Sequence, residues 1–301
     1  RIKGRNMTEN YFEKGDRALS IYEAYGRNPL VFNKVIENYK KGLKLHPKNI
    51  LYHYSLGYAY HLMRRLMEAS MEYEIMLKLN PPRLALDDDL KLADRYAPRL
   101  FVNPKEFFKL KDLVAVIHPK KPIIAYNLFW EDDIDYPGDN DPSDHEVVWI
   151  EFNKKKVEVT GVYTYFHKAI LSTEEAVKDA NLHNQRARIN VQWGEHGSLP
   201  LGWEKLHPEA LFEKISKRIK IKDMPQRYRE LNKSVKNPNH PLAKDWPKKF
   251  TGSYKDFISF SKYIELRKFL KKKKMVITSK WPNAVINRYF LSYNYFPKTV
   301  A

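Results

Sequence analysis

Apolar residues recur with a helical period in the first third of the chain and alternate with polar ones, as in strands, in the middle third. In the first third, residues 38–49 (NYKKGLKLHPKN) align with residues 72–83 (EYEIMLKLNPPR) at an offset of 34 residues, with Tyr39 on Tyr73. Repeated helical segments at a fixed offset predict stacked helical hairpins.

The 34-residue period is similar to that of the tetratricopeptide family. Gly57 and Ala69 match the small positions that let two antiparallel helices approach, and Tyr60 and Tyr73 match the large ones between them. The first unit, residues 16–49, matches only through its second helix, because Glu23 stands where the repeat has glycine. The resemblance implies two hairpins, the first of them degenerate.

Stacked repeats of this type commonly present a groove to a peptide. Aromatic residues on the first helix of the second unit, and two arginines at its end, are the candidate partner contacts. They are Tyr54, Tyr58, Arg64 and Arg65. The alternative is a structural appendage docked on the next domain, since two repeats bury little surface alone. A further helix over residues 84–96, ended by Pro98, is expected to cap the stack.

The middle of the chain, residues 97–205, contains runs rich in Val, Ile and aromatics such as PIIAYNLFW, EVVWIEF and VEVTGVYTY. These runs predict strands, and the NKKK turn between the last two predicts a hairpin. We therefore expect an antiparallel β-sandwich, with a short helix inserted between residues 169 and 184.

An acidic segment interrupts these strands. Residues 123–153 carry nine Asp or Glu and no Lys or Arg, in a chain of net charge +18. Glu146, His167 and His196 fall at strand ends, which can converge on one rim of a sandwich. Carboxylates and imidazoles suit a divalent cation, either Mg, Ca, Mn or Zn. The candidate ligands are Glu146, His167, His196, Asp133, Asp135, Asp144 and His145.

Two alternatives stay open for this segment. Asp133, Asp135 and Asp144 also fall at positions 1, 3 and 12 of an EF-hand loop, although strands instead of helices flank it. The acidic residues are otherwise explained by solvated turn chemistry.

The order of these motifs resembles that of the necrosis-inducing-protein superfamily, which includes fungal vacuolar protein sorting proteins. Asp144, His145 and Glu146 stand where that family has a histidine-aspartate-tryptophan-glutamate run, and His167 and His196 match its later histidines. The tryptophan before the glutamate is absent, and EHGS replaces the family's GSH. The resemblance implies a β-sandwich in which these residues, with Asp133 or Asp135, surround a divalent cation.

The basic charge gathers in the last third of the chain. From residue 204 to residue 301 there are 24 Lys or Arg against eight acids, which is +16 of the total +18. This favours polyanions such as nucleic acid or anionic lipid, while a solvated lysine surface is the alternative. We expect a mainly helical extension packed on the sandwich, with one helix over residues 254–274.

The absence of cysteine excludes disulfides, thiolate metal sites and cysteine nucleophiles, and the chain has no P-loop or GxGxxG motif. Without an apolar run long enough for a membrane span, we expect a cytoplasmic location.

The sequence thus predicts an α+β protein with three parts: tetratricopeptide-like helices over 1–96, a β-sandwich over 97–205 and a basic helical extension over 206–301. The leading hypothesis is a cation-binding sandwich whose helical hairpins bind a partner; a metal-dependent hydrolase is the activity expected if the site is catalytic. The alternatives are a non-enzymatic adaptor that binds a peptide, and a nucleic-acid binder that uses the basic third.

Overall fold

The computed structural model describes residues 7–25, 28–106, 108–134, 143–207, 222–231, 258–271, 273–290 and 296–300. It divides into two compact units. The first is helical and joins the chain up to Pro82 with Trp281–Thr299, and the second is β-rich and covers Arg83–Lys280 with the last two residues. The expected α+β class is confirmed. The division places residues 83–96 in the β-rich unit and residues 281–299 in the helical one, which differs from the boundaries expected at 96 and 205.

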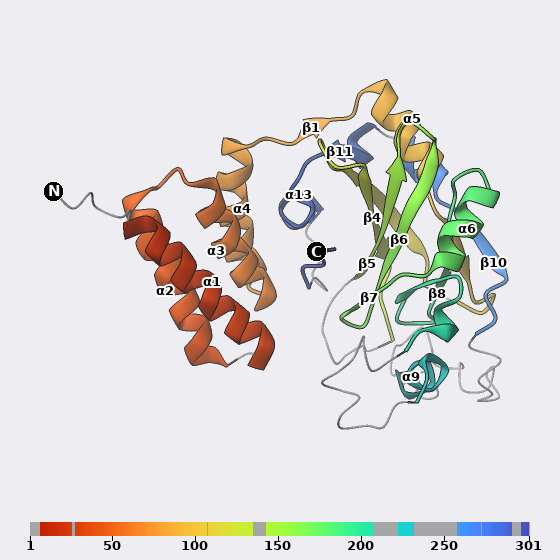
Figure 1. Cartoon of the computed structure of the whole chain (residues 1–301), viewed down its shortest axis with the longest axis horizontal. Coiled ribbons are helices and arrows are strands. Elements are labelled where there is room, and N and C mark those ends of the chain that lie inside the picture. The colour runs from red at the N-terminus through yellow and green to blue at the C-terminus, as the bar shows by residue number, and fades with distance from the viewer. Residues whose placement is uncertain are drawn as a thin grey trace. The chain divides into compact units, whose positions relative to one another are not determined.

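The helical unit contains two antiparallel hairpins (Figure 1). Its helices are α1 (Met7–Tyr25), α2 (Pro29–Leu45), α3 (Ile50–Leu62), α4 (Leu66–Leu79) and α13 (Pro282–Phe290). Asparagine is the N-cap residue of α2 and of α3. The side chain of Asn28 accepts a hydrogen bond from the Leu30 N–H, and that of Asn49 accepts one from the Leu51 N–H. Such caps satisfy backbone donors that the first helical turn leaves open.

Glycines set the close approach of these helices. A Cβ atom built on Gly57 of α3 would lie 2.8 Å from the Tyr73 ring on α4, and one on Gly15 of α1 would lie 2.4 Å from the Tyr39 ring on α2. Both tyrosines are fully buried. The first hairpin therefore also has a glycine that faces its buried tyrosine. This glycine does not align with Gly57 at the 34-residue offset.

Helix α13 continues the stack from the far end of the chain. It packs on α4 and α3 as α3 packs on α2 and α1. Trp281, just before it, donates from Nε1 to the side-chain oxygen of Asn80 at 2.9 Å, and its ring lies 4.5 Å from that of Tyr54. The place of a third repeat's first helix is thus filled by a segment about 200 residues downstream of α4.

The β-rich unit has two sheets. The larger has the order β1-β11-β3-β4-β5-β6-β7, and the smaller has the order β10-β2-β8-β9. The strands are β1 (Arg83–Leu84), β2 (Arg99–Val102), β3 (Leu110–Ile117), β4 (Ile123–Trp130), β5 (Asp144–Asn153), β6 (Glu158–Phe166), β7 (Ala169–Leu171), β8 (Arg188–Val191), β9 (Ser198–Pro200), β10 (Lys262–Glu265) and β11 (Val276–Thr278). Strands β3 to β7 pair antiparallel in chain order, as hairpins do, while β11 pairs parallel to β3 and β8 pairs parallel to β2.

Short helices complete this unit. They are α5 (Asp87–Tyr96), α6 (Glu174–Leu182), η1 (Trp203–Lys205), α9 (Met224–Leu231), α12 (Arg267–Leu270) and η4 (Lys273–Met275). Helix α6 is the expected inserted helix, capped by the Thr173 hydroxyl, which accepts from the Ala176 N–H at 3.1 Å.

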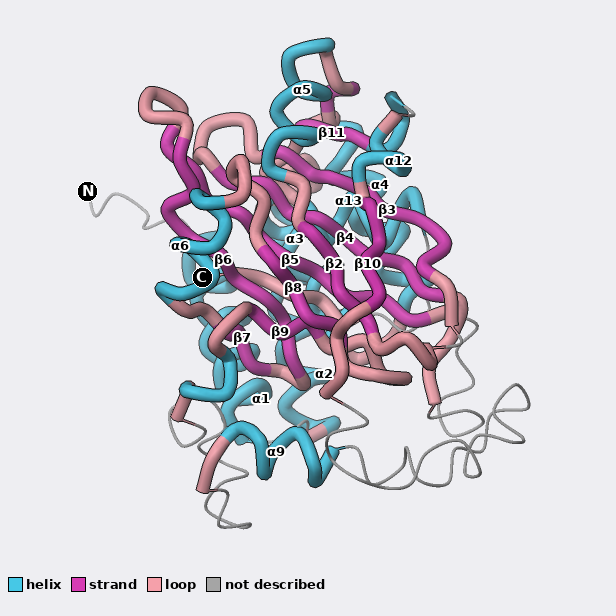
Figure 2. The backbone as a smooth tube through the Cα atoms, turned by 90° about the vertical axis from the view of Figure 1, so that its right-hand side faces the viewer, coloured by secondary structure: helices cyan, strands magenta, loops and turns pink. Residues whose placement is uncertain are grey.

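The core of the β-rich unit lies between its two sheets, which overlap in Figure 2. Leu128 and Trp130 of β4, and Val148 and Ile150 of β5, pack with Ile189 of β8 from the smaller sheet. Successive residues of a strand point to opposite faces, so Asp144 and Glu146 at the start of β5 share the inward face with Val148. The strand alternation therefore brings two carboxylates to one end of this core.

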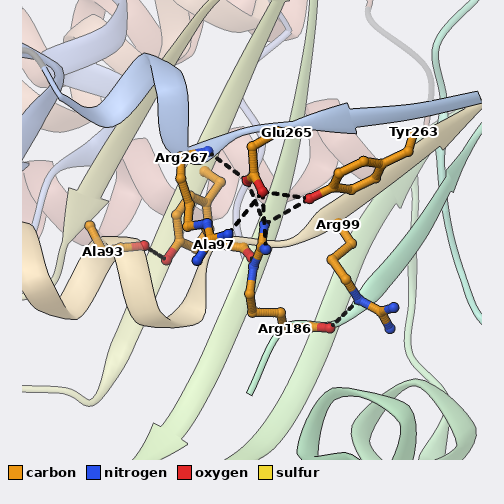
Figure 3. Close-up of polar contacts among 8 residues, drawn as sticks. Ala93, Ala97, Arg99, Arg186, Tyr263, Glu265 and Arg267 are labelled. Atoms are coloured by element: carbon orange, nitrogen blue, oxygen red, sulfur yellow. Dashed lines mark hydrogen bonds and ion pairs between the residues drawn. The ribbon is translucent and has the colours of Figure 1, made fainter. Parts of the chain in front are cut away.

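The helix expected over residues 254–274 is wrong for the part that the structure describes. Residues Lys262–Glu265 form β10, which pairs antiparallel with β2, and only Arg267–Leu270 are α-helical. Glu265 holds the strand in place, since its carboxylate accepts from Arg186 at 2.7 Å, Tyr263 at 2.7 Å and Arg267 at 3.0 Å (Figure 3). Burial alone would raise the pKa of Glu265, but these hydrogen bonds lower it to about 2. A tertiary ion-pair network thus overrides the local helical pattern.

None of the helices in the described ranges has the length and apolar run needed to cross a bilayer.

Candidate functional site

The acidic end of the β-rich core contains His196, which is fully buried. Its Nδ1 lies 2.9 Å from the Asp144 carboxylate, and its Nε2 lies 3.7 Å from that of Glu106. The ring stacks on Trp130, with centroids 4.2 Å apart and planes at 6°. Burial alone would lower the pKa of His196, but Asp144 and Glu106 raise it to about 10. The imidazole is therefore a buried cation, stabilised by two carboxylates and an aromatic face.

The second histidine of the cluster, His167, has a similar environment. Its Nε2 lies 2.6 Å from the Gln192 amide oxygen and 3.2 Å from the Glu195 carboxylate. Burial alone would lower the pKa of His167, but Glu195, Gln192 and the charge of Glu146 raise it above the usual value. His167 and His196 thus each contact acidic side chains. We call Glu106, Asp144, Glu146, His167, Glu195 and His196 the acid-histidine cluster.

Both histidines sit in left-handed backbone conformations. His167 (φ 46°) and Lys168 (φ 73°) form the two-residue turn between β6 and β7, and His196 (φ 52°) follows Gly194 (φ 75°) in the turn between β8 and β9. Non-glycine residues in this region cost about 1 kcal/mol or more each, and such strain concentrates at functional sites. The turns hold the rings against the carboxylates in spite of that cost.

Glu106 connects the cluster to the backbone around it. One carboxylate oxygen accepts from the Phe108 N–H at 3.1 Å, and the other accepts from the Gly194 N–H at 2.8 Å. Next to this turn, the Ile134 N–H donates to the Gly194 carbonyl at 3.0 Å, which brings the segment of the buried Asp133 to the cluster.

The other predicted ligands are placed differently. His145 lies on the opposite face of β5, where its Nε2 is 3.2 Å from the Asn127 side-chain oxygen and its ring is 5.0 Å from that of Phe129. Strand alternation separates it from Asp144 and Glu146. Asp135 and the rest of the acidic turn, residues 135–142, lie outside the described residues.

The structure thus brings together Asp144, Glu146, His167 and His196, and does not bring His145 to them. Within the described ranges, no group of three or more His, Asp or Glu side chains is arranged to hold a metal ion. The carboxylates suit a hard divalent cation, and the part of His167 and His196 as ligands stays a prediction. The divalent cation stays a prediction.

Sequence reasoning missed Glu106, Gln192 and Glu195. Glu195 adjoins His196 and could have been added on that ground, but nothing in the local sequence around Glu106 points to a histidine 90 residues away.

The predicted partner contacts lie in the helical unit. Tyr54 and Tyr58 are half-buried and stack with centroids 6.2 Å apart, and Tyr54 also contacts Trp281. Arg64 (φ 56°) lies in the turn between α3 and α4, and Arg65 contacts Glu68 at 2.8 Å and lies over the Tyr60 ring at 4.8 Å. At the opposite end of α3 from these arginines, Leu51 is 51% exposed. Part of the predicted groove is therefore covered by the chain's own C-terminal segment, while Leu51 and Arg65 face outward.

About half of the basic third of the chain lies outside the described residues, including 208–221 and 232–257. Polyanion binding by this region stays a prediction, as does a hydrolase activity.

Comparison with known proteins matches residues 32–63 to the tetratricopeptide (TPR) repeat family model. The match covers most of α2 and all of α3, so it joins the second helix of one hairpin to the first helix of the next. Searches of curated proteins and of solved structures found no match. The tetratricopeptide prediction is confirmed for this segment and favours a role in protein interaction, whereas the resemblance of the central part to the necrosis-inducing-protein superfamily stays a prediction.

Proposed function

We propose that this chain is an interaction protein whose helical unit binds a partner protein. The observation that carries the proposal is the TPR match over residues 32–63, on hairpins that have the close glycine-tyrosine packing such repeats need. Helical repeats of this kind use exposed side chains of stacked helices for recognition. Spread along α3 from its first turn to the turn that follows it, the exposed Leu51, the half-buried Tyr58 and the residues Arg64 and Arg65 supply an apolar, aromatic and basic surface. Such a surface suits a peptide with an apolar side chain and a carboxylate.

The test compares proteins retained by the immobilised full chain and by its variants. We expect Leu51→Glu to abolish retention of a specific partner, because it puts a charge in the apolar contact. Leu30→Glu is the matched control, since Leu30 is 72% exposed on α2, at the start of the helix before α3. Equal retention by the wild type and the Leu51→Glu variant would contradict the proposal, as would no specific retention by the wild type.

A divalent cation at the acid-histidine cluster is a second candidate function. The cluster holds four carboxylates against two histidines, so its net charge is negative whether or not the imidazoles are protonated. A divalent cation next to Asp144 and Glu146 would neutralise that charge, and hard carboxylate oxygens suit Mg²⁺ or Ca²⁺. Its role would be to stabilise this end of the β-rich unit.

Titration calorimetry with Mg²⁺, Ca²⁺, Mn²⁺ and Zn²⁺ on metal-stripped protein tests the cation. We expect one site whose affinity falls at least tenfold in Glu146→Gln and is unchanged in Glu158→Gln, a half-exposed residue at the start of β6. Absence of binding by all four ions would rule this candidate out and leave the partner-binding proposal untouched.

A further inference from the structure

Helix α4 exposes a continuous apolar stripe. Met67 is 68% exposed, Met71 65%, Ile75 41% and Leu79 38%. Residues four apart lie on one face of a helix, so the four side chains form a single row along α4. Together they present roughly 400 Å² of apolar surface, the size of the largest apolar patch on a typical monomer, and such patches are often interaction sites. We call this row the α4 stripe.

The repeat fold does not require the α4 stripe. At the 34-residue offset, Met67, Met71 and Ile75 correspond to polar residues of α2, namely Asn33, Glu37 and Lys41. These are exposed, and the Lys41 ammonium pairs with the Glu37 carboxylate at 2.6 Å, as expected for a solvated helix face.

A further repeat would not cover the stripe either. The corresponding positions on α2 stay exposed although a second hairpin follows α2 in the stack. Methionine and isoleucine at these positions of α4 therefore serve a contact other than repeat packing.

We propose that the α4 stripe pairs with the α4 stripe of a second copy of this chain, antiparallel about a two-fold axis between Met71 and Ile75. A two-fold interface uses the same patch on both copies, and a straight row of apolar side chains is complementary to itself. Each partner buries about 800 Å² in an interface of standard size. The stripe would supply about half of this area, which is the share expected of an apolar core surrounded by a polar rim.

The charges beside the stripe agree with antiparallel pairing. One end carries Arg65 and Glu68, paired at 2.8 Å, and the other carries Glu74 and Lys78, paired at 2.9 Å. Each end of α4 thus carries one positive and one negative side chain. Antiparallel pairing brings opposite ends together and therefore places no cluster of like charges in contact. Antiparallel helices also align their dipoles favourably.

Sedimentation velocity on the full chain, from about 1 to about 200 µM, tests the pairing. We expect the average mass to rise toward twice that of the monomer, with a dissociation constant on the order of 10 µM for so small a contact. Met71→Lys should remain monomeric over this range. The control variant Glu37→Lys introduces lysine at the corresponding exposed position of α2 and should dimerise like the wild type. Unchanged circular dichroism in both variants shows that the fold is kept.

A second measurement locates the contact. The chain has no cysteine, so a short bismaleimide cross-links only introduced thiols. Met71→Cys should give a covalent dimer at a yield at least tenfold above that of Glu37→Cys. A wild type that stays monomeric at every concentration overturns the proposal and assigns the stripe to another partner. Dimers that persist in Met71→Lys, or equal cross-linking at both positions, overturn it as well. The partner-binding proposal depends on Leu51 and is tested independently.

Discussion

At the scale of single residues, the β-rich unit holds a buried histidine between two carboxylates. His196 lies between Asp144 and Glu106 and against Trp130, and its pKa is raised to about 10. A buried carboxylate pair without a counter-charge is costly, and the imidazolium supplies that charge. Its role is therefore to stabilise the end of the sandwich from which β5 begins.

The raised pKa of His196 predicts a pH dependence of stability. The folded pKa of about 10 exceeds the unfolded value of about 6.5, so the stabilisation is complete below pH ~6.5 and is lost as the pH rises to ~10. We expect the free energy of unfolding of the β-rich unit to fall over this range in denaturant titrations. The His196→Gln variant should be less stable than the wild type at pH ~6.5. Its free energy of unfolding should then decrease much less than that of the wild type as the pH rises. An equal slope in both proteins would show that His196 is neutral in the fold.

A strained turn residue gives a second prediction. Val157 has φ 54°, a left-handed conformation that a β-branched side chain strongly disfavours, and it is 37% exposed. Val157→Gly relieves the strain at a partly exposed turn position, so we expect it to stabilise the protein by about 1 kcal/mol. Chemical denaturation checks this; a loss of stability would mean that the valine side chain contributes packing that outweighs the strain.

At the scale of elements, the hairpin of α3 and α4 depends on the absence of a side chain at residue 57. A Cβ there would lie 2.8 Å from two carbon atoms of the Tyr73 ring, which is fully buried. We expect Gly57→Ala to cost about 1–3 kcal/mol, measured by thermal or urea unfolding of the helical unit, in spite of the better helix propensity of alanine. Ser55→Ala, on the same helix and half-buried, is the control and should change little. Unchanged stability in Gly57→Ala would contradict this packing.

Local pattern predicted the elements well where the contacts that stabilise them are close in sequence. The hairpin of α3 and α4 followed from Gly57, Tyr60 and Tyr73, and β4, β5 and β6 followed from apolar runs separated by turns. The segment at Lys262–Glu265 was predicted as a helix because its stabilising contact, Glu265 with Arg186, joins residues 79 apart. Pattern within a window carries no information on such a pair.

The candidate site divides in the same way. Asp144, Glu146, His167 and His196 were predictable as strand-end residues, and the strand period itself places His145 on the other face. Glu106 was not predictable from the local sequence. Its carboxylate is positioned by hydrogen bonds from the Phe108 and Gly194 N–H groups, and Gly194 lies in a turn far along the chain.

At the scale of the whole molecule, the helical unit is built from both ends of the chain. The 34-residue spacing ends with α4, and nothing in that spacing indicates that Trp281 and α13 complete the stack. Ala284, Val285 and Ile286 of α13 are fully buried. Folding of this unit therefore requires a segment that follows the β-rich unit in sequence, at a cost in loop closure that grows slowly with length.

This closure predicts the effect of Trp281→Ala. The change removes the ring contact with Tyr54 and the hydrogen bond to Asn80, so we expect the helical unit to lose about 2–3 kcal/mol while the β-rich unit keeps its stability. Hydrogen exchange resolved by segment separates the two units. Tyr289→Ala, at a site on α13 that is 53% exposed, is the control and should change exchange little. An equal loss of protection from exchange in both units would contradict their description as two separate compact units.

We propose that the helical unit is the partner-binding part of this protein. The most direct measurement is hydrogen exchange of the full chain with and without the partner retained in the Leu51 comparison. We expect slower exchange in α3 and in the turn that carries Arg64 and Arg65, with unchanged exchange in β5 and at the acid-histidine cluster. Protection confined to the β-rich unit, with α3 unaffected, would contradict it.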